Sequence, residues 1–241
     1  MHVTAFCSQK GGSGKTTLAG HVGVQAELAG AGPVALLDCD PQGSLAAWWN
    51  ARAAQQPAFV STTLATLARD LDQLRERGFK QVVIDTPPAV SRAILSVIEL
   101  SDLVVIPTRP SPHDLRAVAA TLDLAERARK PVVFVLNGAA AKARITADAA
   151  VALSQHGTVA PNFVHHRTGF ATAMIDGRTV MEVYAGSKAA EEIEGLWAYL
   201  AEQIERNGRR RVFARPEPRG FGRRGIPLAG DSTTVELMEL Q

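Results

Sequence analysis

A glycine-rich run near the start of the chain has the residue types that bind phosphate: Lys10, Gly11, Gly12, Ser13, Gly14, Lys15, Thr16 and Thr17. It follows an apolar, strand-like stretch and opens a helical pattern, which is the context of a phosphate-binding loop. Glycines let backbone N–H groups approach phosphate oxygens, and the helix adds its positive N-terminus. We expect Lys15 to reach the β- and γ-phosphates of a nucleotide and the Thr16 hydroxyl to ligate Mg²⁺. The alternative is a plain glycine-rich turn before a helix.

Three aspartates follow apolar, strand-like stretches, where a carboxylate is costly unless a cation or hydrogen bonds compensate it. Asp38 and Asp40 follow the stretch 34–37, and Asp85 follows Ile84. We expect Asp85 to hold a magnesium-bound water, because Mg²⁺ prefers oxygen ligands and keeps several waters. For Asp40 the alternative is a cap on the following helix. The loop and the acids together supply the positioning and charge neutralisation that phosphoryl transfer to water needs.

The elements that must position these residues alternate regularly along the chain. Short apolar runs predict strands near 3–7, 34–38, 58–61, 82–86, 102–106 and 132–136. Helical patterns lie between them at 15–30, 43–54, 64–77, 91–99, 113–128 and 144–155. The strands show little polar alternation, as expected of parallel strands buried on both faces. We therefore predict an α/β fold with a doubly wound, mostly parallel twisted sheet and helices on both faces, of the P-loop NTPase class. Ligands of such sheets bind at the carboxyl ends of the strands.

The pattern weakens after residue 156 and the composition changes after 206. A short strand at 158–160 and helices at 168–175 and 187–206 are expected. The segment 207–241 carries seven arginines against four acidic residues and is rich in glycine and proline. Such a segment buries too little apolar surface to order itself. We therefore predict a P-loop ATPase domain over residues 1–206 and a basic, flexible tail over 207–241.

The overall composition fits a soluble globular protein. Of 241 residues, 46% are apolar and 21% charged, and no apolar run reaches the roughly 18 residues of a membrane span. A strand-like run begins at residue 3, which leaves no room for a signal peptide, so we expect a cytoplasmic protein. Cys7 and Cys39 lie in apolar runs and are expected to be small buried hydrophobes.

The phosphate loop resembles the deviant Walker A loop of the ParA/MinD family of ATPases. The chain has Gln9 where the general loop pattern has glycine, and instead reads K-G-G-x-G-K-T with a second lysine. The segments D-x-D-P-Q after Leu37 and I-D-T-P-P after Val83 resemble the same family. The resemblance implies that Lys10 reaches across a nucleotide-sandwich homodimer to the partner's ATP. It also implies that Asp40 orients the attacking water and that Asp38 supports the Mg²⁺ shell.

The compact length and the segment Pro110-Ser111-Pro112 resemble the small plasmid-partition branch, the ParF-like proteins. The resemblance implies slow, partner-stimulated ATP hydrolysis, a ParB-like or cargo-adaptor partner, and binding of non-specific DNA at the nucleoid. It also implies a contact of Asn137 with the adenine base, although a turn-forming role for this residue is equally open. The expected DNA-binding residues are Arg167, Arg178 and Lys188, joined by Arg209, Arg210 and Arg211 of the tail. Ordinary solvated charge is the alternative for Arg167, Arg178 and Lys188, whereas the tail could instead be a solubilising segment or a site for a protein partner.

Three other functions are alternatives to this one. An ATP-dependent amidating or carboxylating enzyme of the same fold needs a substrate pocket and, for an amidase, a glutamine-handling domain. A redox protein like the nitrogenase iron protein needs cluster-binding cysteines, and neither Cys7 nor Cys39 is suitably placed. A purely structural DNA-binding module would not need the complete ATP site. Membrane targeting is not expected, since the final segment 235–240 is acidic rather than basic and amphipathic.

Overall fold

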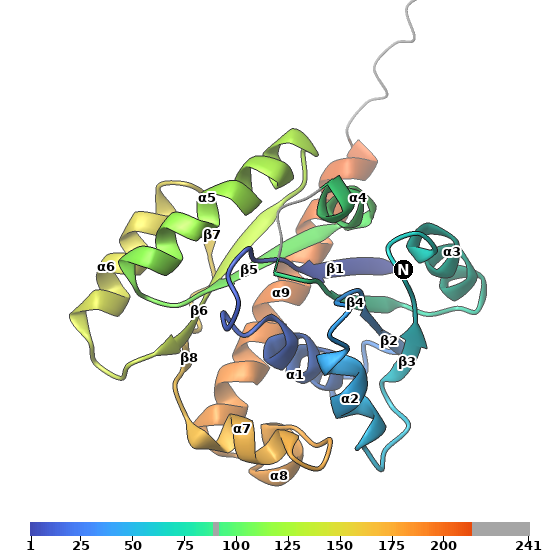
Figure 1. Ribbon diagram of the computed structural model, residues 1–241, viewed down its shortest axis with the longest axis horizontal. Helices are drawn as coiled ribbons and strands as arrows, with labels where there is room; N and C mark the ends of the chain where they lie inside the picture. Colours follow the sequence, from blue (N-terminus) through green and yellow to red (C-terminus); the bar gives the residue numbers. More distant parts are fainter. Residues whose placement is uncertain (89–91, 214–241) are drawn as a thin grey trace, which may run out of the picture.

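The computed structural model describes residues 1–88 and 92–213 and forms a single sheet with helices on both faces (Figure 1). The strands are β1 (His2–Phe6), β2 (Val34–Asp38), β3 (Ala58–Ser61), β4 (Gln81–Asp85), β5 (Leu103–Thr108), β6 (Val132–Ala139), β7 (Thr158–Val159) and β8 (Val164–His165). The helices are α1 (Lys15–Leu28), α2 (Ser44–Asn50), α3 (Leu67–Glu76), α4 (Arg92–Leu100), α5 (Pro112–Arg127), α6 (Arg144–Ser154), α7 (Thr168–Met174), α8 (Val180–Val183) and α9 (Lys188–Phe213).

The strand order is β3-β2-β4-β1-β5-β6-β7, and every pair of neighbours is parallel. From β1 the chain first builds one half of the sheet and then crosses back over β1 to build the other. This is the predicted doubly wound arrangement, and it places a ligand site at the carboxyl ends of the central strands. The register aligns Phe6 with Asp85, and Asp85 with Asp38. The last residue of β1, which leads into the phosphate loop, therefore lies beside the two predicted acids.

Apolar side chains on both faces of the sheet are buried in two separate clusters. One cluster joins the sheet to α1, α2, α7, α8 and α9, and the other joins it to α3, α4, α5 and α6. Consecutive residues of one strand, such as Leu36 and Leu37, belong to different clusters, because side chains alternate between the two faces. Burial on both faces explains why the strands read as continuous apolar runs.

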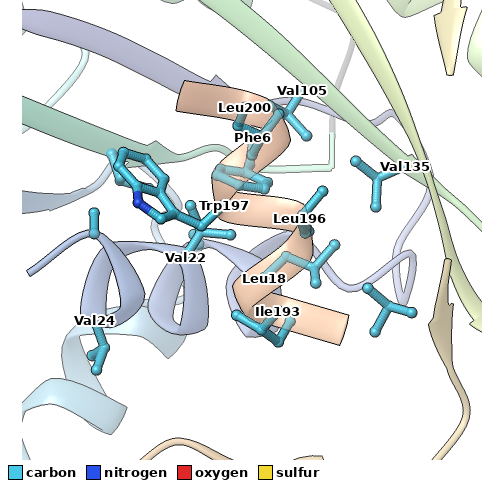
Figure 2. Close-up of a cluster of buried hydrophobic side chains, with 14 of the residues drawn as sticks. Phe6, Leu18, Val22, Val24, Val105, Val135, Ile193, Leu196, Trp197 and Leu200 are labelled. Atoms are coloured by element: carbon cyan, nitrogen blue, oxygen red, sulfur yellow. The ribbon is translucent and has the colours of Figure 1, made fainter. Parts of the chain in front are cut away.

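Helix α9 packs along α1 and fixes the helix that follows the phosphate loop (Figure 2). Leu18 and Val22 of α1 lie in one cluster with Ile193, Leu196 and Leu200 of α9, and all five side chains are fully buried. Each such side chain stabilises the fold by roughly 1.5–3 kcal/mol. The C-terminal helix therefore belongs to the same folding unit as the nucleotide end of the sheet.

Replacing Leu196 with alanine should lower the free energy of unfolding by about 2–5 kcal/mol, because it leaves a cavity between α1 and α9. Urea unfolding followed by circular dichroism measures this change. The control is Glu194→Ala, two residues earlier on the exposed face of the same helix, which should change stability by less than about 0.5 kcal/mol. Equal effects of the two substitutions would contradict the packing of α9 on α1.

The predicted and observed elements differ mainly near the C-terminus. Strand β8 and helix α8 were not predicted, because both are shorter than the windows in which periodicity is visible. Helix α9 continues to Phe213, so residues 207–213, which carry Arg209, Arg210 and Arg211, are helical rather than part of a flexible tail. Ion pairs of Arg206 with Glu202 and of Arg209 with Glu205, spaced i to i+4, support this extension. The rest of the predicted tail lies outside the described residues.

Among the described residues, no helix has the length and apolar character needed to cross a lipid bilayer. Cys7 and Cys39 are buried free thiols, as predicted. Burial raises the pKa of each thiol to about 12, so both behave as apolar side chains at neutral pH.

Candidate nucleotide-binding site

The loop between β1 and α1 has the backbone geometry that its glycines allow. Gly12 and Gly14 have φ angles of 75° and 95°, in the left-handed region that other residues rarely occupy. Space also excludes a side chain at Gly14, since a Cβ there would lie 2.0 Å from the Asn137 side-chain nitrogen. Gly14 caps the N-terminus of α1, and no acidic residue occupies the first turn of that helix. The positive end of α1 therefore faces the loop uncompensated, as an anion site requires.

The buried Asp85 and the half-buried Thr16 form a pair at the centre of the site. The Thr16 hydroxyl donates a hydrogen bond of 2.5 Å to Oδ2 of Asp85. Oδ1 of Asp85 is buried and has no hydrogen-bond partner among the described residues. Burial raises the pKa of Asp85 to about 7, against the lowering effects of the Thr16 hydrogen bond and of Lys15. A cation beside Asp85 would lower that pKa again.

The donor set around this pair fits Mg²⁺. One hydroxyl and one carboxylate, placed next to a phosphate loop, match an ion that takes few protein ligands and otherwise binds phosphates and water. In the part of the chain that the structure describes, no group of three or more His, Cys, Asp or Glu side chains is arranged to hold a metal ion. Lys15 is nearly buried beside the pair, and burial lowers its pKa, while Asp85 and Asp40 act to raise it.

Asp38 holds the backbone that follows it. Its Oδ1 accepts the N–H of Asp40 at 2.9 Å, and its Oδ2 accepts the N–H of Ala46 in the first turn of α2 at 3.0 Å. Asp38, rather than Asp40, thus caps α2, and it fixes the backbone that carries Asp40. The prediction that Asp38 supports a magnesium shell stays a prediction.

Asp40 is held in a tight turn and faces open space. Its Oδ1 accepts the N–H of Gln42 at 3.0 Å, and the α2 N-cap residue Gly43 makes no side-chain cap. The residue is partly exposed and lines a pocket of about 440 Å³ together with Lys15 and Thr16. The orientation of the attacking water by this carboxylate, which the family resemblance implies, stays a prediction.

A second pocket, of about 330 Å³, also borders the loop. Asn137, Arg109 and Phe170 line it, and Gly12, Gly14 and Thr17 line both pockets. Asn137 donates a hydrogen bond of 2.8 Å to the Ser13 carbonyl, so it also braces the loop from the end of β6. Asn137 lines this second pocket, and its contact with an adenine base stays a prediction.

The side chain of Lys10 contacts an acidic residue of its own chain. Its Nζ is 3.5 Å from Oδ1 of Asp114, a buried residue in the first turn of α5. Asp114 also pairs with the Ser111 hydroxyl at the N-cap of that helix. Asp114 was not predicted as a site residue. Its position three residues after Ser111 signals a helix start, but nothing in the spacing links it to Lys10.

His21, five residues beyond Thr16, was also missed. Its Nδ1 bonds the Thr17 carbonyl at 2.8 Å, and its Nε2 accepts the Val180 N–H at 3.2 Å. Full burial lowers the pKa of this imidazole to about 4, so the ring is neutral at pH 7. The ring also meets Phe170 edge-on, with the centroids 5.2 Å apart. His21 therefore ties the phosphate-loop helix to the wall of the second pocket.

The stability that His21 contributes should be lost in acid. Its pKa is near 6.5 in the unfolded chain and about 4 in the folded chain, so only the unfolded chain takes up a proton between these values. The contribution is complete above pH 6.5 and falls by up to about 3 kcal/mol as the pH drops to 4. Chemical unfolding at several pH values measures this slope. A His21→Gln variant, which cannot titrate, should show a shallower slope, and an unchanged slope would contradict a neutral buried ring.

The predicted DNA-binding residues differ in whether an acidic side chain neutralises their positive charge. Arg167 pairs with Glu192 at 2.6 Å, a carboxylate that also binds His165, and this contact raises the pKa of Arg167. Arg178 pairs with Asp176 at 2.6 Å. The exposed Lys188 makes no ion pair within the described residues. Arg209 pairs with Glu205 at 3.2 Å, and the side chains of Arg210 and Arg211 lie outside the described residues.

Comparison with known proteins agrees with this site. A family model described as VirC1 protein matches residues 1–190. The chain belongs to the VirC1 family. Over 221 residues it is 34% identical to the maintenance of carboxysome distribution protein A of Gloeobacter kilaueensis, covering 86% of this chain and 96% of that relative. It is also 37% identical over 127 residues to protein ParA of Rhizobium radiobacter, covering 52% of this chain and 56% of that relative.

The solved structures show the same fold. The MinD cell division protein of Aquifex aeolicus has a TM-score of 0.71 at 14% identity, with 84% of this chain and 97% of that chain covered. The family model and the sequence relatives confirm the resemblance to the ParA/MinD family that was inferred from the phosphate loop, and the solved structure confirms the doubly wound P-loop fold. These relatives place the chain among the partition and positioning ATPases.

Proposed function

We propose that this chain is an ATP-dependent switch that partitions or positions a cargo in the cytoplasm, at the nucleoid. The observation that best supports an ATP site is the buried Asp85, which pairs with Thr16 beside the phosphate loop and whose Oδ1 lacks a partner among the described residues. A plain glycine-rich turn has no need of a buried carboxylate, whose desolvation costs several kcal/mol unless a cation compensates it.

Each residue of the site has a task in this proposal. The loop N–H groups and Lys15 bind the terminal phosphates of ATP. Thr16 and Asp85 would hold Mg²⁺, which when bound neutralises phosphate charge. Asp40, fixed by the hydrogen bond from its backbone to Asp38, orients the water that attacks the γ-phosphate. Hydrolysis is slow in the isolated chain and is stimulated by a ParB-like or cargo-adaptor partner.

Lys10 gives the switch its dependence on a second copy of the chain. In an ATP-sandwich homodimer it leaves Asp114 and reaches the partner's phosphates. Its side chain is 41% exposed, and an ion pair of that exposure is worth no more than about 1 kcal/mol. Contact with a triphosphate therefore outweighs the contact with Asp114, so Lys10 changes partners when an ATP-bound copy docks.

The names of the relatives suggest the kind of cargo, and the charge of the protein surface suggests the track, which is the polymer that the ATP-bound protein binds. One relative is named for the distribution of carboxysomes and another is named ParA, so the cargo is either a protein assembly or a DNA molecule. The track is non-specific DNA. Lys188 is the main contact of the folded domain, because acids neutralise Arg167 and Arg178. Arg209, Arg210 and Arg211 of α9 are proposed as further contacts on their charge alone, although Glu205 also pairs with Arg209.

Binding to a long DNA duplex without nucleotide, with ADP and with ATP and Mg²⁺ tests this function at two or more salt concentrations. We expect binding with ATP only, weakening steeply with salt because phosphate contacts release counterions. Lys188→Ala should lower the salt slope by about 0.9 for each phosphate that the lysine neutralises, whereas Arg178→Ala, the matched control, should change it little. Binding that ignores the nucleotide, or no binding at all, would contradict the proposed track.

A further inference from the structure

Arg109 is a cation at the nucleotide site to which neither the sequence motifs nor the proposed mechanism gives a task. It follows β5 directly, and its carbonyl accepts the N–H of Ser111 at 2.8 Å, which fixes its backbone at the start of α5. The side chain is exposed, and no ion pair or side-chain hydrogen bond holds it within the described part of the chain. An uncompensated guanidinium at a phosphate loop strengthens the attraction for an anion.

The position of the side chain shows where it acts. Nη2 of Arg109 lies 3.8 Å from the place of a Cβ on Gly12, in the middle of the phosphate loop. Its Cγ and Nε lie 3.8 Å from the place of a Cβ on Gly138, the residue after Asn137. From its backbone after β5, the side chain therefore passes the end of β6 and reaches the phosphate loop. It borders both the loop and the second pocket.

The two pockets separate the two ends of a nucleotide. The pocket of about 440 Å³ holds Lys15, Thr16 and Asp40, the groups for the terminal phosphates, the metal and the attacking water. Arg109 does not line it. Arg109 lines the pocket of about 330 Å³ with Asn137 and Phe170, where the nucleoside would lie. Because Gly12, Gly14 and Thr17 line both pockets, the phosphate nearest the nucleoside passes beside Arg109.

We infer that Arg109 binds the α-phosphate of the nucleotide and positions the nucleoside end of ATP and ADP alike. This inference rests on the proposed nucleotide site. A planar guanidinium suits the task, because it donates two parallel hydrogen bonds to phosphate oxygens. Arg109 would contact a phosphate that ATP and ADP share, whereas Lys10 acts on the partner's ATP and Asp40 acts at the γ-phosphate. Both nucleotide states of the switch depend on Arg109.

The test is calorimetric titration of the full chain with Mg-ADP and Mg-ATP. Arg109→Gln should weaken the binding of both nucleotides by the same factor, about tenfold or more, as expected for loss of a charge-assisted hydrogen bond. Arg109→Lys, which keeps the charge but cannot donate two parallel hydrogen bonds, should recover part of the affinity. The matched control is Arg127→Gln, at the exposed far end of α5, about 22 Å along the helix, with affinity unchanged. Competition with adenosine, which has no phosphate, should be the same in the parent and in Arg109→Gln.

Three outcomes would overturn the assignment. Unchanged affinity for ADP and ATP would remove Arg109 from the site. A loss confined to ATP would place the guanidinium on the γ-phosphate or on the partner's nucleotide. An equal loss for adenosine would mean that Arg109 stacks on the base. If the parent chain itself bound no nucleotide, the proposed function would fail as well, whereas the three outcomes above, seen with a parent chain that binds nucleotide, would overturn this inference alone.

Discussion

Replacing Lys15 with alanine should weaken ATP binding at least about a hundredfold, because a nearly buried cation opposite the β- and γ-phosphates is lost. No other substitution is expected to have a larger effect on affinity. Lys15 is enclosed by the loop and its pKa is lowered by burial, so its charge acts in a medium that screens it little. Calorimetric titration with Mg-ATP measures the loss.

The control for Lys15 is Lys80→Ala. Lys80 precedes β4 at the amino end of the sheet, opposite the phosphate loop, and its side chain is exposed. That variant removes the same charge and should bind ATP as the parent does. Circular dichroism confirms that both variants fold. Parent-like affinity in Lys15→Ala would contradict the assignment of the loop as the nucleotide site.

Replacing Asp40 with alanine should slow ATP hydrolysis by about a hundredfold or more while ATP binding changes only a few-fold. The loss is that of a group that orients the attacking water, whose contribution is typically 10²–10⁴-fold. Because hydrolysis ends the ATP state, the variant should accumulate as the ATP-bound dimer. Phosphate release and the molecular mass in ATP are the two measurements.

A second variant separates catalysis from folding at this position. Asp40→Asn keeps an oxygen that can accept the Gln42 N–H, and so keeps the turn, but it removes the negative charge. It should be as slow as Asp40→Ala. Hydrolysis at the parent rate in Asp40→Asn would mean that the turn, rather than the carboxylate, is what the site needs.

Much of the fold and the centre of the site could be predicted because their signals are local. The phosphate loop is one contiguous run, and Asp38 and Asp85 end apolar strands whose register then aligns them. The parallel sheet follows from runs of apolar residues that are buried on both faces. Such features depend on a few neighbouring residues, so a single sequence is enough to predict them.

The contacts of the site could not be predicted in the same way, because they join residues far apart in the chain. Lys10 meets Asp114, and His21 accepts the N–H of Val180, only once the sheet has brought α1, α5 and α8 together. Arg167 is neutralised by Glu192, 25 residues later, which no spacing in the sequence suggests. Two local signals were overlooked, the pairing of Asp176 with Arg178 and the acid–base pairs that extend α9.

The central claim is that ATP joins two copies of this chain through Lys10. Light scattering coupled to gel filtration, without nucleotide, with ADP and with ATP and Mg²⁺, tests it most directly. We expect the 25.6 kDa monomer without nucleotide and with ADP, and twice that mass with ATP, most clearly in Asp40→Ala. Adding Lys10→Ala to that variant should restore the monomer while ATP still binds. A mass that is the same in ADP and ATP, or a dimer that survives Lys10→Ala, would contradict the account.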